Sequence, residues 1–288
     1  MNTYIYFEVV KMEPCRSILR TVSIDGRTIH LRKPDSVTSR WIGQQEVYRF
    51  LISSLLKSCP EDHCMFPVLV GNPGAGKTTL ASAMAEELNL PVYLINCTSD
   101  MRPEDLIVTL VLGENRQGIY QGSALVSAVV NGGICILDEA NRMNERTWAS
   151  LAPLLDGRDY VESVIAGVKI HAHPDFRLIA TMNDDSSTFG IPGYIESRLK
   201  PVLPVNSPTQ EELVQIIQVN VPFIPQELIR AVIDYLASPE GKKKAGTFSI
   251  RDAINVTRYA SRLKLPRQEA IEKAAGCIIS STGILNAS

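Results

Sequence analysis

The chain has 288 residues, of which 45% are hydrophobic and 21% are charged, and its formal net charge is −2. That length can form one large and one small domain, and a charge near zero excludes the strong positive field with which proteins recruit nucleic acid. No apolar run approaches the roughly 18 residues of a membrane span, so we expect no membrane partner.

The cysteines and the N-terminus indicate a compartment. The first residues lack a basic region and a small-residue cleavage site, so we expect no signal peptide. The cysteines are scattered and form no complete metal-binding pattern, which favours reduced thiols and a cytoplasmic protein. Their positions are 15, 59, 64, 97, 135 and 277.

Residues 1–39 are predicted to form an N-terminal extension with a β-hairpin. Two short apolar stretches, Ile18 to Ile24 and Arg27 to Leu31, flank Asp25-Gly26. This pair favours the two-residue type I′ turn. Residues 41–46 then lead into an amphipathic helix.

The next element contains a phosphate-binding motif. Residues 71–78 read GNPGAGKT and match G-x-x-x-x-G-K-[ST] at every fixed position. An apolar strand precedes the motif and a helix follows it, which is the arrangement that wraps backbone N–H groups around a polyphosphate. Lys77 is expected to reach the β- and γ-phosphates, and the Thr78 hydroxyl to bind Mg²⁺. The sequence therefore predicts nucleoside triphosphate binding.

From residue 66 onward, short apolar strands alternate with helices. This alternation predicts an α/β fold with a five-stranded parallel sheet covered by helices on both faces. A β-hairpin at 160–165 and 168–173, turning at Ala166-Gly167, is predicted within this region. The five strands are expected at 66–71, 91–97, 133–137, 176–182 and 201–205.

Polar residues follow two of these strands. Asp138 and Glu139 end the third strand, where one carboxylate can hold Mg²⁺ and the next can activate a water molecule. Asn183 ends the following strand, at the edge where open parallel sheets bind ligands. An asparagine there can hydrogen-bond a γ-phosphate, and local sequence equally allows one that only closes the strand into a turn.

After residue 206 the pattern becomes helical. Ser207-Pro208-Thr209-Gln210 predicts a helix start with a capping box. Helices are expected at 209–219, 225–237, 249–264 and 267–281, while Lys242 to Lys244 are expected in a solvated loop. The predicted domains are therefore the extension 1–39, a nucleotide-binding α/β domain 40–206 and a helical lid 207–288.

Residues 40–265 resemble an AAA+ ATPase of the MoxR, CbbQ/NorQ and dynein/midasin-like branch. Trp41-Ile42-Gly43-Gln44 is similar to the segment that packs on adenine. Gly122-Ser123-Ala124-Leu125, running into Leu137-Asp138-Glu139-Ala140-Asn141-Arg142, is similar to the approach to the acidic strand end in this branch. Residues 98–121 occupy the place of its helix-2 insert, and 160–173 that of its second inserted hairpin.

The resemblance implies roles for three further positions. Asn183 corresponds to sensor 1, Arg198 to the arginine finger that reaches a neighbouring subunit, and Arg251 to sensor 2 on the lid. Without the resemblance, both arginines would be interpreted as exposed charges at helix ends. The expected nucleotide-binding residues are Ile42, Gly43, Asn72, Pro73, Gly74, Ala75, Gly76, Lys77, Thr78 and Thr79.

The function implied by the resemblance is ATP hydrolysis with Mg²⁺ by a ring of identical subunits, expected to be hexameric, that remodels or activates a partner protein. Relatives often act with a von Willebrand-type partner. Two alternatives remain open: a nucleic-acid motor of McrB type, which the acidic isoelectric point near 6.1 disfavours, and a slowly hydrolysing nucleotide switch or scaffold.

Overall fold

A computed structural model of the chain describes residues 18–37, 40–59, 62–113, 116–184, 190–245 and 248–279. Residues 1–17 of the expected extension, with Cys15, and the end of the expected lid from residue 280 lie outside the described residues. The chain forms two compact units. Of the described residues, those in the ranges 1–40, 49–70 and 78–203 form the first unit, and those in 41–48, 71–77 and 204–288 form the second.

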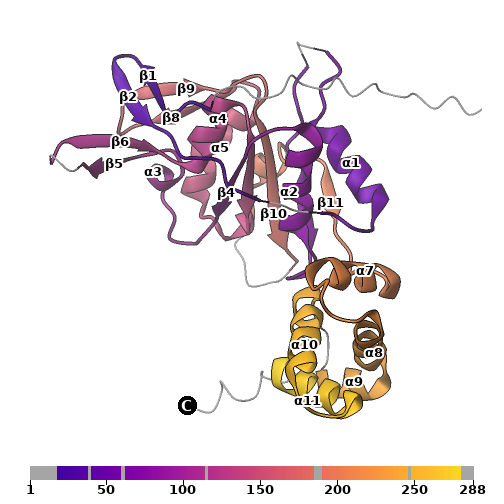
Figure 1. Cartoon of the computed structure of the whole chain (residues 1–288). Coiled ribbons are helices and arrows are strands. Elements are labelled where there is room, and N and C mark those ends of the chain that lie inside the picture. Colours follow the sequence, from indigo (N-terminus) through magenta and orange to yellow (C-terminus); the bar gives the residue numbers. More distant parts are fainter. Residues whose placement is uncertain are drawn as a thin grey trace, which may run out of the picture. The chain divides into compact units, whose positions relative to one another are not determined.

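The larger unit is built on a five-stranded parallel sheet (Figure 1). Each of the five predicted strands is present, with ends within two residues of those expected. The third strand shows why the prediction worked, because its residues Ile134 to Leu137 are all fully buried, as an apolar strand covered on both faces must be. The strand order is β11 (Val202–Pro204), β3 (Val68–Gly71), β10 (Arg177–Asn183), β7 (Ile134–Asp138) and β4 (Val92–Asn96).

Helices flank this sheet. In Figure 1, β4 and β10 stand between α4 (Ala124–Asn131) and α5 (Glu145–Leu155) on one side and α1 (Gln45–Leu55) and α2 (Lys77–Leu88) on the other. The start of α5 follows from its sequence, because the Asn144 side chain accepts a hydrogen bond from Thr147 N and so caps the first turn. Trp148 and Leu151 of this helix are fully buried.

A second sheet joins the N-terminal hairpin to the insert. Its order is β1 (Thr21–Ile24), β2 (Arg27–His30), β6 (Gly118–Gly122) and β5 (Val108–Leu112), with β2 and β6 parallel. The predicted hairpin is confirmed: Asp25 and Gly26 have φ of 47° and 75°, as a type I′ turn requires. The pair β5–β6 was not predicted, since the sequence indicated only an insert there.

The hairpin β8 (Tyr160–Ser163) and β9 (Val168–His171) was predicted with longer strands and a tighter turn. Its connection has four residues, because Ser163 organises it from the first strand. The Ser163 carbonyl accepts from Gly167 N at 2.8 Å, and its hydroxyl accepts from Ala166 N at 3.1 Å. Residues 164 and 165 are thereby removed from the strand ladder.

The second unit is mainly helical and contains its own apolar core. Two local predictions were wrong here. The first helix begins with Thr209 as its cap, because Glu212 completes a capping box with Thr209 and not with Ser207. Lys242 to Lys244 lie in a short helix instead of a loop, because Ser238 accepts from Gly241 N at 3.0 Å and starts a new turn. The helices are α7 (Gln210–Asn220), α8 (Gln226–Ala237), α9 (Pro239–Ala245), α10 (Ile250–Arg262) and α11 (Arg267–Ile279).

None of the helices in the described ranges has the length and apolar character needed to cross a membrane.

Candidate functional site

The phosphate-binding motif forms a loop between β3 and α2 that requires glycine at two positions. Gly74 and Gly76 have φ of 77° and 92°, a left-handed conformation that other residues adopt only with strain. Space is limiting as well, since a Cβ on Gly74 would lie 2.7 Å from Ser249 Cβ and one on Gly76 would lie 3.2 Å from the Trp41 ring. The bare backbone of this loop fits the close approach of a polyphosphate.

The lysine of the motif is held over the same loop. Lys77 is 6% exposed, and its Nζ donates to Gly71 O at 2.8 Å and to Asn72 O at 2.9 Å. Ala75 N donates to Asn72 O, which tightens the turn. A buried ammonium with three donors suits a polyphosphate, whose oxygens can replace the loop carbonyls as acceptors.

The segment expected to pack on adenine is fixed to the start of α7. Gln44 N donates to Glu212 Oε1 at 3.0 Å, and the Gln44 side chain exchanges two hydrogen bonds with the backbone of Asn206. Backbone N–H groups, first that of Thr209 and then that of Gln44, hold the pKa of Glu212 below its usual value. Gly43 has a φ of 84°, and a Cβ there would lie 2.2 Å from Glu212 Oε1. Ile42 precedes it and is half-buried.

The expected sensor-2 arginine lies on the helix that meets the phosphate loop. Arg251 is the second residue of α10, whose cap Ser249 is the residue that a Gly74 side chain would meet. Ser249 and Asp252 form a capping box, which fixes the start of the helix at this place. Arg251 is exposed and therefore free to move toward a ligand in the loop.

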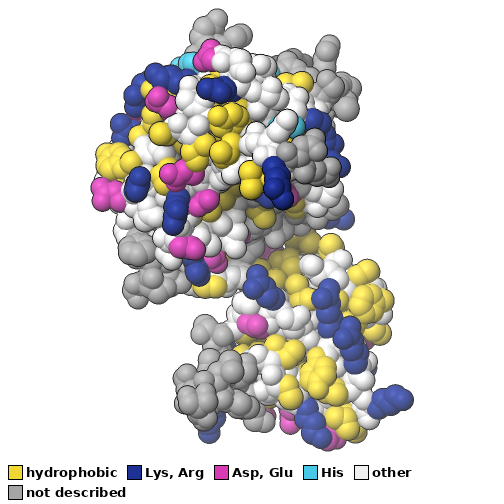
Figure 2. Space-filling model, turned by 90° about the vertical axis from the view of Figure 1, so that its left-hand side faces the viewer, with side chains coloured by type: hydrophobic (Ala, Val, Ile, Leu, Met, Phe, Trp, Pro, Cys, Tyr) yellow, Lys and Arg dark blue, Asp and Glu magenta, His cyan; other side chains and the backbone are white. Residues whose placement is uncertain are grey.

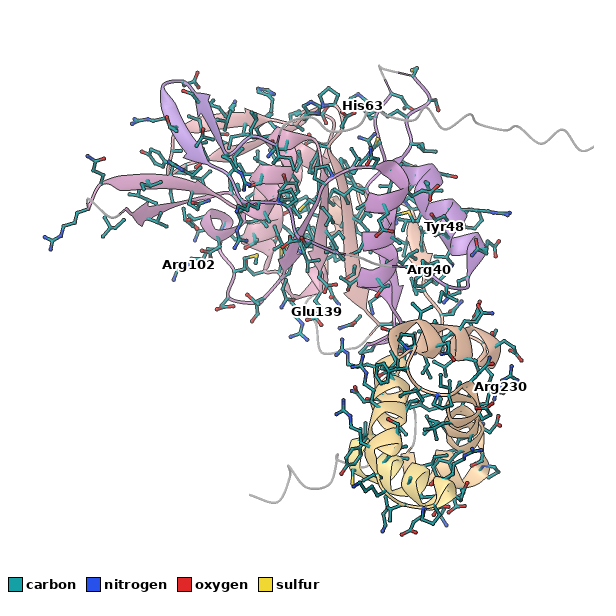
Figure 3. All side chains as sticks on the ribbon, viewed as in Figure 1. Arg40, Tyr48, His63, Arg102, Glu139 and Arg230 are labelled. Atoms are coloured by element: carbon teal, nitrogen blue, oxygen red, sulfur yellow. The ribbon has the colours of Figure 1, made fainter. Side chains whose placement is uncertain are left out.

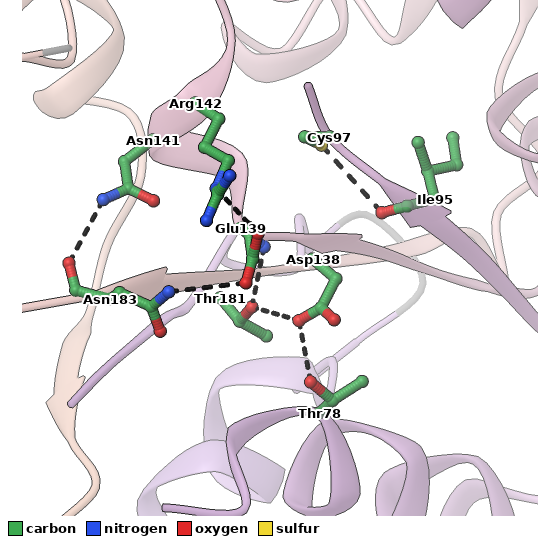
Figure 4. Close-up of polar contacts among 9 residues, drawn as sticks. All are labelled: Thr78, Ile95, Cys97, Asp138, Glu139, Asn141, Arg142, Thr181 and Asn183. Atoms are coloured by element: carbon green, nitrogen blue, oxygen red, sulfur yellow. Dashed lines mark hydrogen bonds and ion pairs between the residues drawn. The ribbon is translucent and has the colours of Figure 1, made fainter. Parts of the chain in front are cut away.

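In the larger unit, two threonines converge on one oxygen of Asp138 (Figure 4). Thr78 Oγ1 donates to Asp138 Oδ1 at 2.7 Å, and Thr181 Oγ1 donates to the same oxygen. A hydroxyl and a carboxylate are oxygen ligands of the kind that Mg²⁺ takes in proteins. Thr78 and Asp138 therefore fit the metal-binding roles expected of them.

Glu139 lies directly after Asp138 with an unusual backbone. Its φ is 55°, a left-handed value that is strained for glutamate and concentrates at functional sites. Its Oε2 lies 2.7 Å from Arg142 Nε, and its Oε1 accepts from Asn183 Nδ2 at 3.4 Å. Figure 3 shows Glu139 at the edge of the unit where β7 and β10 end. The expected water-activating residue and sensor 1 are thus neighbours.

A buried thiol borders this group of acids. Cys97 follows β4 and is 1% exposed, and its backbone N donates to Asp138 O at 2.9 Å. Burial, together with the charges of Asp138 and Glu139, raises the pKa of Cys97 to about 12. The thiol therefore stays neutral at physiological pH and packs as a small apolar residue.

Arg198 lies away from these acids. Its guanidinium contacts Tyr194 O and lies 3.9 Å from Asp156 Oδ2. Arg158 donates from Nε and Nη2 to the two carboxylate oxygens of Asp156. These hydrogen bonds are the main cause of the lowered pKa of Asp156. Arg198 lines a cavity of about 500 Å³ together with His63. Figure 3 places His63 at the end of the larger unit opposite Glu139, so Arg198 does not belong to the acid cluster of its own chain.

Comparison with known proteins identifies the domain. Residues 67–203 match the family model "AAA domain (dynein-related subfamily)". This segment is an AAA domain of that subfamily. Over 140 residues the chain is 36% identical to the denitrification regulatory protein NirQ of Stutzerimonas stutzeri, covering 48% of this chain and 47% of NirQ. The chain thus spans about half the length of this curated relative.

Solved structures show that the fold of this AAA domain and its helical region is that of AAA+ P-loop ATPases. A RuvB mutant of Thermotoga maritima is 20% identical and has a TM-score of 0.55, covering 81% of this chain and 70% of RuvB. NtrX of Brucella abortus, in complex with ADP, is 17% identical with a TM-score of 0.55, covering 77% of this chain and 50% of NtrX.

Three residues of the AAA domain and the helical unit that organise these groups were not predicted as site residues: Thr181, Arg142 and Glu212. Thr181 has a signal in the sequence, because it lies two positions before Asn183 on the same face of β10. Arg142 lies three positions after Glu139 and can turn back to it. Glu212 has a local signal for its capping box with Thr209 but none for its contact with Gln44, which is 168 positions away.

Proposed function

We propose that this chain binds ATP with Mg²⁺ and hydrolyses it. The observation that carries this proposal is the 2.7 Å hydrogen bond between Thr78 and Asp138. It joins the residue after the phosphate-loop lysine to the acid at the end of β7, the two positions from which a P-loop ATPase holds its metal ion. The AAA domain match and the ADP complex of NtrX support nucleotide as the ligand.

The proposed mechanism depends on position and charge, since phosphoryl transfer to water needs little covalent help. Lys77 and the loop N–H groups bind and orient the phosphates. Thr78 and Asp138 would hold Mg²⁺, which would neutralise phosphate charge when bound. Glu139 accepts a proton from the attacking water, and Asn183 orients that water beside it.

We further propose that the subunits form a ring in which Arg198 completes the site of a neighbour. The position of Arg198 supports this, because its cavity lies opposite Glu139 in its own unit. Arg251 would link the lid to the γ-phosphate of its own site, since it lies two positions after Ser249, the residue beside Gly74 of the phosphate loop. The number of subunits expected from the resemblance is six.

The proposed purpose of the ATP cycle is to activate or remodel a partner protein. NirQ, the relative with 36% identity over the matched stretch, is named a denitrification regulatory protein. A regulatory ATPase of this kind acts on another protein, and a von Willebrand-type partner is our first candidate. Pull-down with the Glu139→Gln variant, which should retain ATP and the assembled ring, tests for such a partner.

One observation favours a second candidate, a slowly hydrolysing nucleotide switch. Glu139 Oε2 is engaged by Arg142 at 2.7 Å. A carboxylate oxygen that is paired with a guanidinium must leave it before it can contact the attacking water, so the basal rate of such a protein would be low. Under this candidate, binding of ATP and not its turnover would be the signal to the partner.

Phosphate release from ATP tests the proposal. The wild-type chain should release phosphate with MgCl₂ and not with EDTA. Lys77→Ala should neither bind ATP nor release phosphate, because the loop loses its ammonium. Lys33→Ala, which removes an exposed lysine elsewhere, is the matched control and should behave as wild type. A folded wild-type chain that binds Mg·ATP without turnover would favour the switch instead.

A further inference from the structure

We propose that Thr181 is a positioning residue that sets both acids of the candidate site, Asp138 and Glu139. This inference rests on the proposed function in so far as it concerns metal binding and hydrolysis. Thr181 is fully buried in β10. The sheet register pairs Ala180 with Leu137, so that the next residues along the two parallel strands, Thr181 and Asp138, are level with each other.

The Thr181 hydroxyl is both a hydrogen-bond donor and a hydrogen-bond acceptor. It donates to Asp138 Oδ1, and its oxygen accepts from Glu139 N at 3.1 Å (Figure 4). A hydroxyl has one proton to donate, and here that proton goes to the acid while a lone pair takes the backbone N–H of the next residue. One side chain therefore contacts two consecutive residues of the acidic strand end.

The first contact sets the orientation of the Asp138 carboxylate. Oδ1 receives two hydroxyl donors, from Thr78 and Thr181, which arrive from two different elements. Two donors on one oxygen fix the rotation of the carboxylate and would leave Oδ2 available to a metal ion. The partner of a metal-binding carboxylate commonly tunes metal affinity in this way.

The second contact holds the backbone turn at Glu139. Glu139 has a φ of 55°, and such a conformation persists only where surrounding contacts determine it. The hydrogen bond from Glu139 N to Thr181 is one of these contacts. It fixes the residue whose carboxylate lies beside Asn183, two positions after Thr181 on the same strand.

Packing alone does not require a hydroxyl at this position. Leu178, Ala180 and Met182 of β10 point to the main core, so Thr181 belongs to the opposite face of the strand. Ile179 on that face is also fully buried, which shows that an aliphatic side chain is accommodated there. Valine has the shape of threonine without the donor and acceptor, so Thr181→Val removes the hydrogen bonds and leaves the volume.

The experiment compares Thr181→Val with Thr181→Ser in the full chain. Affinity for fluorescent ADP is measured with MgCl₂ and with EDTA, and kcat is measured by phosphate release. With MgCl₂, Thr181→Val should bind ADP about 10–100-fold more weakly than wild type, and its kcat should fall by a similar factor. Its affinity for ADP in EDTA should equal that of wild type. Thr181→Ser, which keeps the hydroxyl, should retain the wild-type affinity and kcat. A valine variant with the wild-type affinity in MgCl₂ and the wild-type kcat would overturn the proposal.

A readout without nucleotide separates this inference from the proposed function. Amide hydrogen exchange at Glu139 should be faster in Thr181→Val than in wild type, and unchanged in Thr181→Ser. Faster exchange in the valine variant supports the positioning role even if the wild-type chain hydrolyses no ATP. Unchanged exchange overturns it. Should Thr181→Val not fold, Thr181→Ala is the second variant, with the same expected and overturning results.

Discussion

At the scale of single residues, Glu139 is the group on which the proposed turnover depends. Its carboxylate has Asn183 on one oxygen and Arg142 on the other. Its backbone N–H is bound by Thr181. These contacts separate two proposed tasks: Asp138 and Thr78 would hold the metal ion, and Glu139 would take the proton of water. The two tasks can therefore be removed independently.

Glu139→Gln should keep Mg·ATP binding and lose hydrolysis. Only the proton acceptor is neutralised, and general-base catalysis is typically worth about 10²–10⁴-fold in rate. Nucleotide affinity by calorimetry and phosphate release measure the two effects. The control is Glu145→Gln, an exposed glutamate of α5. Turnover of the Glu139→Gln variant at the wild-type rate would mean that another group is the base.

Arg142→Ala should raise the basal rate of phosphate release. The guanidinium contacts the proposed base at 2.7 Å, and an ion pair as exposed as this one contributes roughly 0.2–1 kcal/mol. Its loss should therefore increase kcat by up to about fivefold. Arg146→Ala, at an exposed arginine of α5, should have no effect. A rate below wild type in Arg142→Ala would show that Arg142 assists hydrolysis.

At the scale of elements, the start of α10 connects the helical unit to the phosphate loop. Ser249 caps this helix and is the residue next to Gly74. A rotation of α10 would therefore move Ser249 relative to the phosphate loop, and a ligand bound in the loop would restrict the rotation of α10. Arg251 is the side chain that can sense such a ligand.

Arg251→Ala should weaken ATP binding more than ADP binding. The reason is that only ATP carries the γ-phosphate that the guanidinium is proposed to contact. A charged hydrogen bond is worth roughly 1.5–3 kcal/mol, so discrimination should fall by about 10–100-fold. Affinities for ADP and for a non-hydrolysable ATP analogue measure it. Arg262→Ala, at the other end of α10, is the control. Equal losses for both nucleotides would make Arg251 a structural residue.

Glu212→Gln should destabilise the start of α7 in a pH-dependent way. Backbone N–H groups of Thr209 and Gln44 lower the pKa of Glu212 below 4.5. A depressed pKa means that the ionised form stabilises the fold above the usual pKa, and that this contribution is lost as the pH falls through the folded value. The Tm difference between wild type and variant should therefore be largest near pH 7 and shrink below pH 4.5. A difference independent of pH would contradict this account.

At the scale of the whole molecule, the proposed active site is shared between subunits. Arg198 and Glu139 belong to the same unit, yet the cavity of Arg198 lies at the end opposite Glu139. Figure 2, turned so that the left-hand side of Figure 1 faces the viewer, shows hydrophobic, basic and acidic side chains interspersed on this face of the larger unit. Specific activity should rise with protein concentration as rings form.

Mixing two inactive variants tests the shared site. Arg198→Ala should bind ATP and hydrolyse it poorly, since a trans arginine is typically worth on the order of 10³–10⁵ in rate. Glu139→Gln should also be inactive. In a mixture, a site with an intact Glu139 can receive Arg198 from a Glu139→Gln neighbour, so phosphate release should reappear. Labelled subunits verify exchange. An inert mixture with demonstrated exchange would refute the trans role of Arg198.

The sequence by itself determined the phosphate loop, the five strands of the parallel sheet and the helical character of the C-terminal region. Each of these features is local: a glycine pattern, a short apolar run or a helical period is contained within a few consecutive residues. The acids Asp138 and Glu139 were found for the same reason, since they directly end a buried strand.

Only the tertiary structure decided which distant groups meet. The pairing of β2 with β6 joins strands about 90 residues apart, and the bond from Thr181 to Asp138 spans 43 positions. Register between strands sets such contacts, and a shift of one residue would turn Thr181 to the other face of the sheet. A pattern within a few consecutive residues does not specify that register, because the register depends on how the whole sheet packs. The sequence therefore located the acids, and the fold selected the hydroxyl that holds them.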